Sequence, residues 1–506
     1  MVTMDTQTSL LAPKKWLLIV YLLIFYALGA AIRLYDLTDL PLDFHPTRQM
    51  RAAVMARGMY YQTQPDAPAW QREMAVAQWQ EEGLIEPPIM ERLTAFTYRL
   101  AGGEHLWVAR VYAILFWLAG SIFVFLLAKD IAGPDGGLVA LAYMLFLPYG
   151  TIASRSFQPD PLMTAMLAAS LWCMTRWHRS RRWRWVAAAG LLGGLTILVK
   201  AVSVFFIGAA WLGLTLSSLG FRQALRDRQV WLLAGLILLP YALFHVYGVY
   251  INGELASQYS QRFFPQLWLD PVHYLQWKGA IAGTVGFEWF LTALVSIFLV
   301  QAKALRGLLT GVWAGYGAYG MFFSYHIATH DYYQLPLIPL VALGLGVGAG
   351  FVLPRLQGRR VFLFPLAAAA LAFAIVTQAW DVRVQLKRDD YRPEAGYWQR
   401  LGQELGQGAT VVGLTHDYGY RLAYWGWVNS TAWMTSGDYN LRALGGAEID
   451  TEAAFEEAVA GKDYFIVTLL GEWERQPKLR ALLERRYPLL ETETDALVFD
   501  LRRHDQ

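Results

Sequence analysis

Apolar segments of about the length that crosses a bilayer recur through the first 380 residues of this 506-residue chain. A membrane-spanning helix needs roughly 20 apolar residues. A chain that is 56% hydrophobic and 16% charged carries more apolar surface than one soluble core buries. The sequence therefore predicts a polytopic α-helical membrane protein. The candidate spans are eleven, at 16–33, 107–128, 137–153, 161–176, 185–199, 201–219, 230–250, 281–302, 307–326, 335–353 and 361–379.

The lysines and arginines between the spans predict the orientation. Sixteen of them fall in the N-terminal tail and in alternate loops, whereas the short loops on the other side hold Arg155, Lys200, Arg262 and Lys278. The positive-inside rule places the N-terminus in the cytoplasm, and an odd number of spans places the C-terminus outside. The basic, tryptophan-rich stretch 176–184 is expected to anchor a helix end at the interface, and we expect no nucleic-acid partner.

Two regions expected on the outer side are too long to be simple connectors. In 34–106, the apolar residues Ile89, Leu93, Phe96 and Leu100 mark one face of a helix that can lie on the membrane interface. Pro87 and Pro88 would start that helix. The sequence thus predicts interfacial helices in the first outer loop.

The tail 381–506 has the pattern of a small α/β domain. Buried-strand signals at 409–414, 464–469 and 496–501 alternate with helical stretches such as 452–460. We expect two domains, a transmembrane module over 1–380 and an extracytoplasmic α/β domain over 381–506. The single cysteine, Cys173, excludes an intrachain disulfide framework, and no glycine-rich phosphate loop indicates a nucleotide site.

Ionisable and hydrogen-bonding side chains gather at the expected outer ends of the spans. Such groups at membrane depth are costly and mark functional sites. Taken singly, Asp160 can be read as a helix N-cap before Pro161, Lys200 as a side chain that snorkels to the interface, and the His330–Asp331 pair as a loop clamp. Their convergence on one surface favours a site. The candidates are Asp43, His45, Arg48, Glu86, Asp160, Lys200, Arg262, His330, Asp331, Tyr332 and Tyr333.

The order of several short motifs resembles the GT-C glycosyltransferases. These motifs are an aspartate soon after the first span (Asp43), Glu86-Pro87-Pro88, Trp107-Val108-Ala109-Arg110, Pro159-Asp160-Pro161, and a tyrosine-rich loop that leads into Leu335-Pro336-Leu337-Ile338-Pro339. Over residues 16–380 the chain is most similar to glycosyltransferase family 39, the protein O-mannosyltransferase and lipid A aminoarabinose transferase group.

The resemblance implies a GT-C fold of about eleven spans and an enzyme that transfers a hexosyl or pentosyl group. The donor would be a polyprenyl-phosphate-linked sugar, and the acceptor a protein, lipid or glycan outside the cytoplasmic membrane. The family's catalytic carboxylate in the first loop matches Asp43, and its acid after the third span matches Asp160. Relatives commonly carry a second acid directly after the first. Phe44 stands there in this chain, which puts a metal-assisted mechanism in doubt.

The chemistry of the transfer assigns roles to these residue types. A base must take the proton of the acceptor hydroxyl, and cations must stabilise the departing phosphate. Asp43 is the candidate base, while Arg48, Lys200 and Arg262 are candidate phosphate ligands. His45 and His330 could donate to the phosphate or, with Glu86, bind a metal. No spacing specifies a metal site, so a divalent metal stays an open alternative.

Two other classes of protein fit part of the pattern. A secondary transporter would place its charges near the bilayer midplane on broken helices and show repeats, and neither sign is evident in the sequence. An envelope scaffold or binding protein would act through the tail, which is long enough to fold alone. The scaffold leaves the ionisable cluster without a purpose. The glycosyltransferase is the leading interpretation.

Overall fold

The computed structural model describes residues 9–259 and 262–503, and their contacts divide the chain into two compact units. Unit 1 comprises Met1–Leu37, Leu84–Pro87 and Arg110–Arg388. Unit 2 comprises Thr38–Gly83, Pro88–Ala109 and Asp389–Gln506. Most of the segment 38–109 is thus grouped with the tail. The sequence division at residue 380 stays a prediction.

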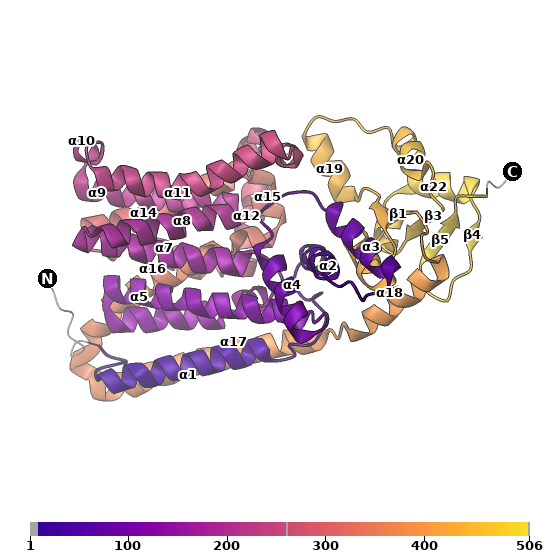
Figure 1. Ribbon diagram of the computed structural model, residues 1–506. Helices are drawn as coiled ribbons and strands as arrows, with labels where there is room; N and C mark the ends of the chain where they lie inside the picture. Colours follow the sequence, from indigo (N-terminus) through magenta and orange to yellow (C-terminus); the bar gives the residue numbers. More distant parts are fainter. Residues whose placement is uncertain (1–8, 260–261, 504–506) are drawn as a thin grey trace. The chain divides into compact units, whose positions relative to one another are not determined.

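Unit 1 is a bundle of long apolar helices, drawn from indigo to orange in Figure 1. The helices are α1 (Lys15–Leu34), α5 (Trp107–Phe146), α6 (Pro148–Ala153), α7 (Asp160–Ser180), α8 (Trp183–Val199), α9 (Val204–Leu219), α10 (Phe221–Ala224), α11 (Arg228–Val246), α12 (Pro271–Thr284), α13 (Phe287–Ser296), α14 (Lys303–Phe322), α15 (Ser324–Thr329), α16 (Leu337–Val352) and α17 (Arg360–Arg388).

The predicted number of eleven spans is not confirmed. Within the described residues, six helices are long and apolar enough to cross a membrane, or seven if the bent pair Pro271–Thr284 and Phe287–Leu299 is one span. Two predicted spans, 107–128 and 137–153, are joined in α5, which kinks at Gly133 (φ 79°) just before Pro134. The predicted multi-pass helical class therefore holds at this coarser level.

Glycines let the bundle helices approach closely. A Cβ atom on Gly346 of α16 would lie 2.6 Å from the carbonyl oxygen of Gly136 in α5, and one on Gly344 would lie 2.5 Å from that of Ala293 in α13. Small residues at such crossings let backbones meet, and dispersion contacts then hold the helices together. The glycine-rich stretch 344–350 thus serves helix packing.

Unit 2 combines the loop helices with a five-stranded sheet. Its helices are α2 (Pro46–Tyr61), α3 (Ala69–Gln80), α4 (Ile89–Ala101), α18 (Arg392–Leu405), α19 (Ser436–Leu444), α20 (Thr451–Val459), α21 (Leu470–Glu474) and α22 (Pro477–Arg486). Its strands are β1 (Val411–Leu414), β2 (Ser430–Ala432), β3 (Tyr464–Val467), β4 (Leu489–Leu490) and β5 (Leu497–Asp500).

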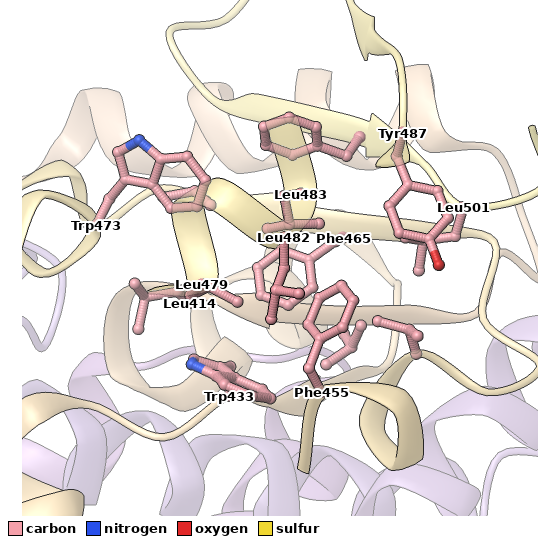
Figure 2. Packing of buried hydrophobic residues seen from close by; sticks show 14 residues of the cluster. Leu414, Trp433, Phe455, Phe465, Trp473, Leu479, Leu482, Leu483, Tyr487 and Leu501 are labelled. Atoms are coloured by element: carbon pink, nitrogen blue, oxygen red, sulfur yellow. The ribbon is translucent and has the colours of Figure 1, made fainter. Parts of the chain in front are cut away.

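The sheet has the strand order β2-β1-β3-β5-β4, in which β1 pairs in parallel with β2 and β3, and β5 is antiparallel to β3 and β4. The three strand signals read from the sequence coincide with β1, β3 and β5 and are confirmed. Figure 2 shows the core on this sheet, where Trp433, Phe455 and Phe465 meet leucines of α22. Buried aromatic rings contribute large apolar areas to a core of this kind.

Helix α4 begins directly after Pro88, as predicted, and its buried face differs from the apolar stripe that is expected to lie on the membrane interface. Met90, Ala95 and Tyr98 are buried, whereas Phe96 is 53% and Leu100 73% exposed. The side chains of α4 that pack in unit 2 lie on the side of the helix opposite the stripe. Phe96 and Leu100 of the stripe are left on the surface, where a membrane interface could take them.

Candidate active site

An ion pair is buried near one end of the bundle. Lys200 Nζ lies 2.6 Å from Asp160 Oδ1, and the Asp160 side chain is 1% exposed and that of Lys200 12%. Asp160 is the first residue of α7 and makes no capping hydrogen bond, so the N-cap interpretation is wrong. Lys200 directly follows α8, and its ammonium faces the carboxylate instead of snorkelling. A pair this buried is costly unless its geometry is good, which suggests a functional reason for it.

Rings of the tyrosine-rich segment η7 (Asp331–Gln334) lie beside this pair. Lys200 Nζ is 5.2 Å from the centre of the Tyr332 ring, a cation–π distance. Tyr333 stacks on Tyr319 with ring centres 5.9 Å apart and on His326 at 5.4 Å. The result is an aromatic wall next to the ammonium group.

Three further candidates belong to the same part of the bundle. The His330 ring is 5.7 Å from that of Tyr332 and 5.5 Å from that of His326. Arg262 is close enough to His326 for its positive charge to act on that imidazole. The Tyr149 hydroxyl is within electrostatic reach of Asp331 and Asp160. The structure therefore brings together seven predicted residues of unit 1: Asp160, Lys200, Arg262, His330, Asp331, Tyr332 and Tyr333.

Several polar atoms around the ion pair are buried without a hydrogen-bond partner among the described residues. They include Asp160 Oδ2, both side-chain polar atoms of Gln158, and the hydroxyls of Thr164 and Ser203. Leaving such an atom unpaired costs roughly 1–3 kcal/mol. Native proteins keep few of these atoms, and those they keep call for an explanation such as a bound ligand. These residues lie within four positions of Asp160 or Lys200 in the sequence, and their unpaired atoms indicate where a polar substrate group could bind.

Two buried arginines, neither of them a predicted site residue, hold two segments of the bundle together. Arg33 donates from Nε to Ser154 Oγ (2.7 Å) and from Nη1 to the Leu145 carbonyl (2.9 Å). Arg155 donates from Nη2 to the Asp36 carbonyl (2.8 Å). These bonds tie the end of α1 to the segment that leads into α7. The available signal was an arginine inside the first apolar segment, which membrane energetics makes expensive.

An apolar cavity of about 310 Å³ also lies within the bundle. It is lined mainly by aromatic side chains of α12, α13 and α14, and Lys278 is the lysine in its wall. Trp277 in this wall donates to the Tyr316 hydroxyl (2.8 Å), which donates to Gln334 Oε1 (2.7 Å). Since Gln334 directly follows Tyr333, a buried hydrogen-bond chain links the cavity to η7.

Asp43, His45 and Arg48 belong to unit 2. Asp43 is half-buried in the turn before α2, and His45 enters the helix in the left-handed region (φ 44°, ψ 64°). Gln49 Nε2 donates to the Phe44 carbonyl (2.6 Å) and lies 3.5 Å from Asp43 Oδ1. Pro46 at the first helical position and the Gln49 bond define this turn locally. Burial, and then the nearby Asp389 and Asp43, raises the pKa of Tyr391.

The positions of Arg48 and Glu86 do not by themselves indicate a role. Arg48 is half-buried in the first turn of α2. Glu86 lies in the 84–87 segment of unit 1, where Leu84 approaches Gly248. Among the described residues, no group of three or more His, Cys, Asp or Glu side chains could hold a metal ion.

Comparisons with known proteins agree on the class of fold. Among solved structures, ArnT from Cupriavidus metallidurans in the apo state matches with a TM-score of 0.58 and 16% identity, over 95% of this chain and 98% of that chain. ArnT bound to undecaprenyl phosphate matches with a TM-score of 0.57, also at 16% identity and the same coverage. The fold is that of the GT-C superfamily glycosyltransferases, as the sequence motifs predicted.

A more distant structure and a family model extend this result. The archaeal oligosaccharyltransferase AglB from Archaeoglobus fulgidus, in complex with an inhibitory peptide and a dolichol-phosphate, matches with a TM-score of 0.53 and 9% identity, over 90% of this chain and 69% of that chain. Residues 85–247 match the family model described as dolichyl-phosphate-mannose-protein mannosyltransferase. No curated protein matches the chain in sequence. Both comparisons agree with the resemblance to GT-C glycosyltransferases that the sequence motifs indicated.

Proposed function

We propose that this chain is a membrane glycosyltransferase that moves a sugar from a polyprenyl-phosphate-linked donor to an acceptor hydroxyl outside the cytoplasmic membrane. The observation that carries the proposal is the bundle site, where cations, an aromatic wall and unpaired buried polar atoms occur together. An anionic phosphate and a sugar ring need these partners. The lipid phosphates bound to ArnT and AglB support the same class of donor.

In the proposed reaction, the acceptor oxygen attacks the anomeric carbon and the bond from that carbon to the phosphate oxygen breaks. The Asp43 carboxylate takes the acceptor's proton as general base. Lys200 and Arg262 offset the negative charge that develops on the leaving phosphate, and His330 is a further donor. Asp160 orients the Lys200 ammonium through their 2.6 Å ion pair.

The prenyl chain needs an apolar place near the phosphate ligands. The cavity lined by Trp277, Phe290 and Trp313 fits such a chain in chemistry, since concave apolar surfaces rich in aromatic residues take hydrophobic ligands. The hydrogen-bond chain from Trp277 to Gln334 connects this cavity to the segment of His330 to Tyr333. We therefore assign the lipid tail to unit 1.

A transporter remains the weaker candidate despite the break between α12 and α13, which are bent by 92°. Broken helices of transporters expose backbone carbonyls that coordinate ions. Here the carbonyl of Val285 at the break accepts a hydrogen bond from the Tyr143 hydroxyl (2.6 Å). This carbonyl at the break is thus satisfied by a tyrosine hydroxyl of the protein.

The class of protein is tested by incubating the purified chain in lipid nanodiscs with polyprenyl-phosphate sugars and candidate acceptors. A glycosyltransferase releases polyprenyl phosphate only when donor and acceptor are both present. A scaffold or a transporter releases none with any donor. The proposed orientation is tested separately, because a reporter fused after Gln506 should be active only outside the cytoplasm.

A further inference from the structure

Two contacts from the C-terminal part of unit 2 bracket the turn that carries Asp43. Before the turn, Asp39 Oδ1 accepts a hydrogen bond from the backbone N–H of Tyr391 (3.1 Å). After it, Thr47 Oγ1 donates to Asp417 Oδ1 (2.8 Å). Both partners are more than 350 positions away in the sequence but belong to the same compact unit. The tail therefore holds the turn on either side of Asp43.

Asp417 is a well-fixed acceptor. Its second oxygen, Oδ2, accepts from Arg421 Nε (2.5 Å), and its side chain is buried. Its backbone is left-handed (φ 52°), and so is that of Tyr418 (φ 55°). Residues other than glycine persist in this region when their surroundings hold them there, and such residues gather at functional sites.

The segment of residues 416–427, which contains Asp417, also contacts the other end of α2. Arg57 Nη2 donates to the carbonyl of Ala423 (2.8 Å), and its guanidinium lies 4.4 Å from the ring centre of Tyr424 and 4.1 Å from that of Trp427. Residues 416–427 thus contact α2 near its first and last turns. A helix fixed at both ends presents the turn before it in one orientation.

We propose that Asp417 is a positioning residue for Asp43, acting through the Thr47 hydroxyl. This inference rests on the proposed role of Asp43 as the base. The Thr47–Asp417 bond fixes the start of α2, and the Gln49 amide transfers that position to the turn through its bond to the Phe44 carbonyl. A base must stay within a fraction of an ångström of its productive place, and a 1 Å error can cost about 10²-fold in rate.

The test compares variants of the full-length chain in nanodiscs. Thr47→Val keeps the shape of the side chain and removes the hydroxyl. It should lower kcat by roughly 10-fold while KM for the donor is unchanged. Thr47→Ser restores the hydroxyl and should return kcat to near the parental value. Asp417→Asn keeps an oxygen for Thr47 but loses the charge that faces Arg421, so its loss of kcat should be smaller.

The matched control is Thr63→Val after the other end of α2, where the hydroxyl donates to the nearby Tyr60 carbonyl (2.9 Å). It should leave kcat unchanged. A second readout separates positioning from general damage: in an Asp43→Asn background, Thr47→Val should cause no further loss, because it acts through Asp43. A further loss there would contradict the proposal.

The outcomes also separate this inference from the assignment of the base. If Thr47→Val works at the parental rate while Asp43→Asn is impaired, the positioning role is wrong and the base assignment stands. If Asp43→Asn itself works at the parental rate, Asp43 is not the base, and Asp417 has no base to position.

Discussion

The Asp160–Lys200 pair of unit 1 differs in its surroundings from the exposed ion pairs of unit 2. The Asp160–Lys200 pair of the bundle is almost fully buried, next to aromatic rings and polar atoms without partners. In unit 2, ion pairs such as Arg480–Glu484 are half exposed, and Thr435 and Asp438 form a capping box at α19. Exposed pairs contribute little to stability, whereas burying a pair is costly. The difference indicates that the Asp160–Lys200 pair serves chemistry, whereas exposed pairs such as Arg480–Glu484 do not.

The largest effect is expected from breaking the buried pair of the bundle. Lys200→Met leaves the Asp160 carboxylate without its cation, and Asp160→Asn leaves the Lys200 ammonium without its anion. Each change should lower the free energy of unfolding by about 3–5 kcal/mol. Removing both should cost less than the sum of the two. Thermal unfolding in detergent micelles measures this.

The control is Asp130→Asn, which breaks a partly exposed pair with Arg179 (3.1 Å). That change should cost no more than about 1 kcal/mol. Equal losses for Asp130→Asn and Asp160→Asn would remove the contrast between buried and exposed charge on which the comparison rests.

The second effect concerns the two faces of α4 in unit 2. Tyr98→Ala removes a fully buried ring and should destabilise the unit by about 3 kcal/mol or more. Phe96→Ser on the exposed stripe should change the free energy of unfolding by less than about 0.5 kcal/mol. Chemical denaturation followed by tryptophan fluorescence distinguishes them. A large loss for Phe96→Ser alone would mean that the stripe is packed in the protein.

A smaller effect is expected where the loop helices meet the tail in unit 2. Arg57→Lys keeps the charge but loses the forked donors that reach Gln78 and Ala423, which should cost about 2 kcal/mol. Protease cleavage between α2 and α3 should rise with this loss. Arg72→Lys, at a half-buried site of α3, is the control. If cleavage is unchanged in Arg57→Lys, the loop helices do not depend on the tail.

Features of the fold and of the site that depend on neighbouring residues could be predicted from the sequence, whereas contacts between distant residues could not. The strands β1, β3 and β5 and the start of α4 follow from nearby residues, and the structure confirms them. The Asp160–Lys200 pair joins residues 40 apart, and the Thr47–Asp417 bond joins residues 370 apart. No periodicity encodes such pairings. The residue types were therefore predictable, but not their partners.

The smallest effect is a pH dependence in unit 2. Burial, and then the nearby Arg421, lowers the pKa of His416 below its ordinary value of 6.5. Below pH 6.5 the unfolded chain therefore binds more protons at this site than the folded one, so stability falls as pH decreases through that value and stays level above it. His416→Gln should flatten this part of the curve. An unchanged slope in His416→Gln would assign the pH dependence to other groups.

The most direct test of the central claim is the turnover of Asp43→Asn measured together with its donor binding. Asparagine keeps the shape of the side chain and removes the basic site, so sugar transfer should fall by roughly 10²–10⁴-fold while polyprenyl-phosphate sugar binds as before. Lys200→Met should instead weaken donor binding, because it removes a charge that faces the phosphate in our proposal. A folded, membrane-inserted Asp43→Asn that transfers sugar at the parental rate would contradict the account.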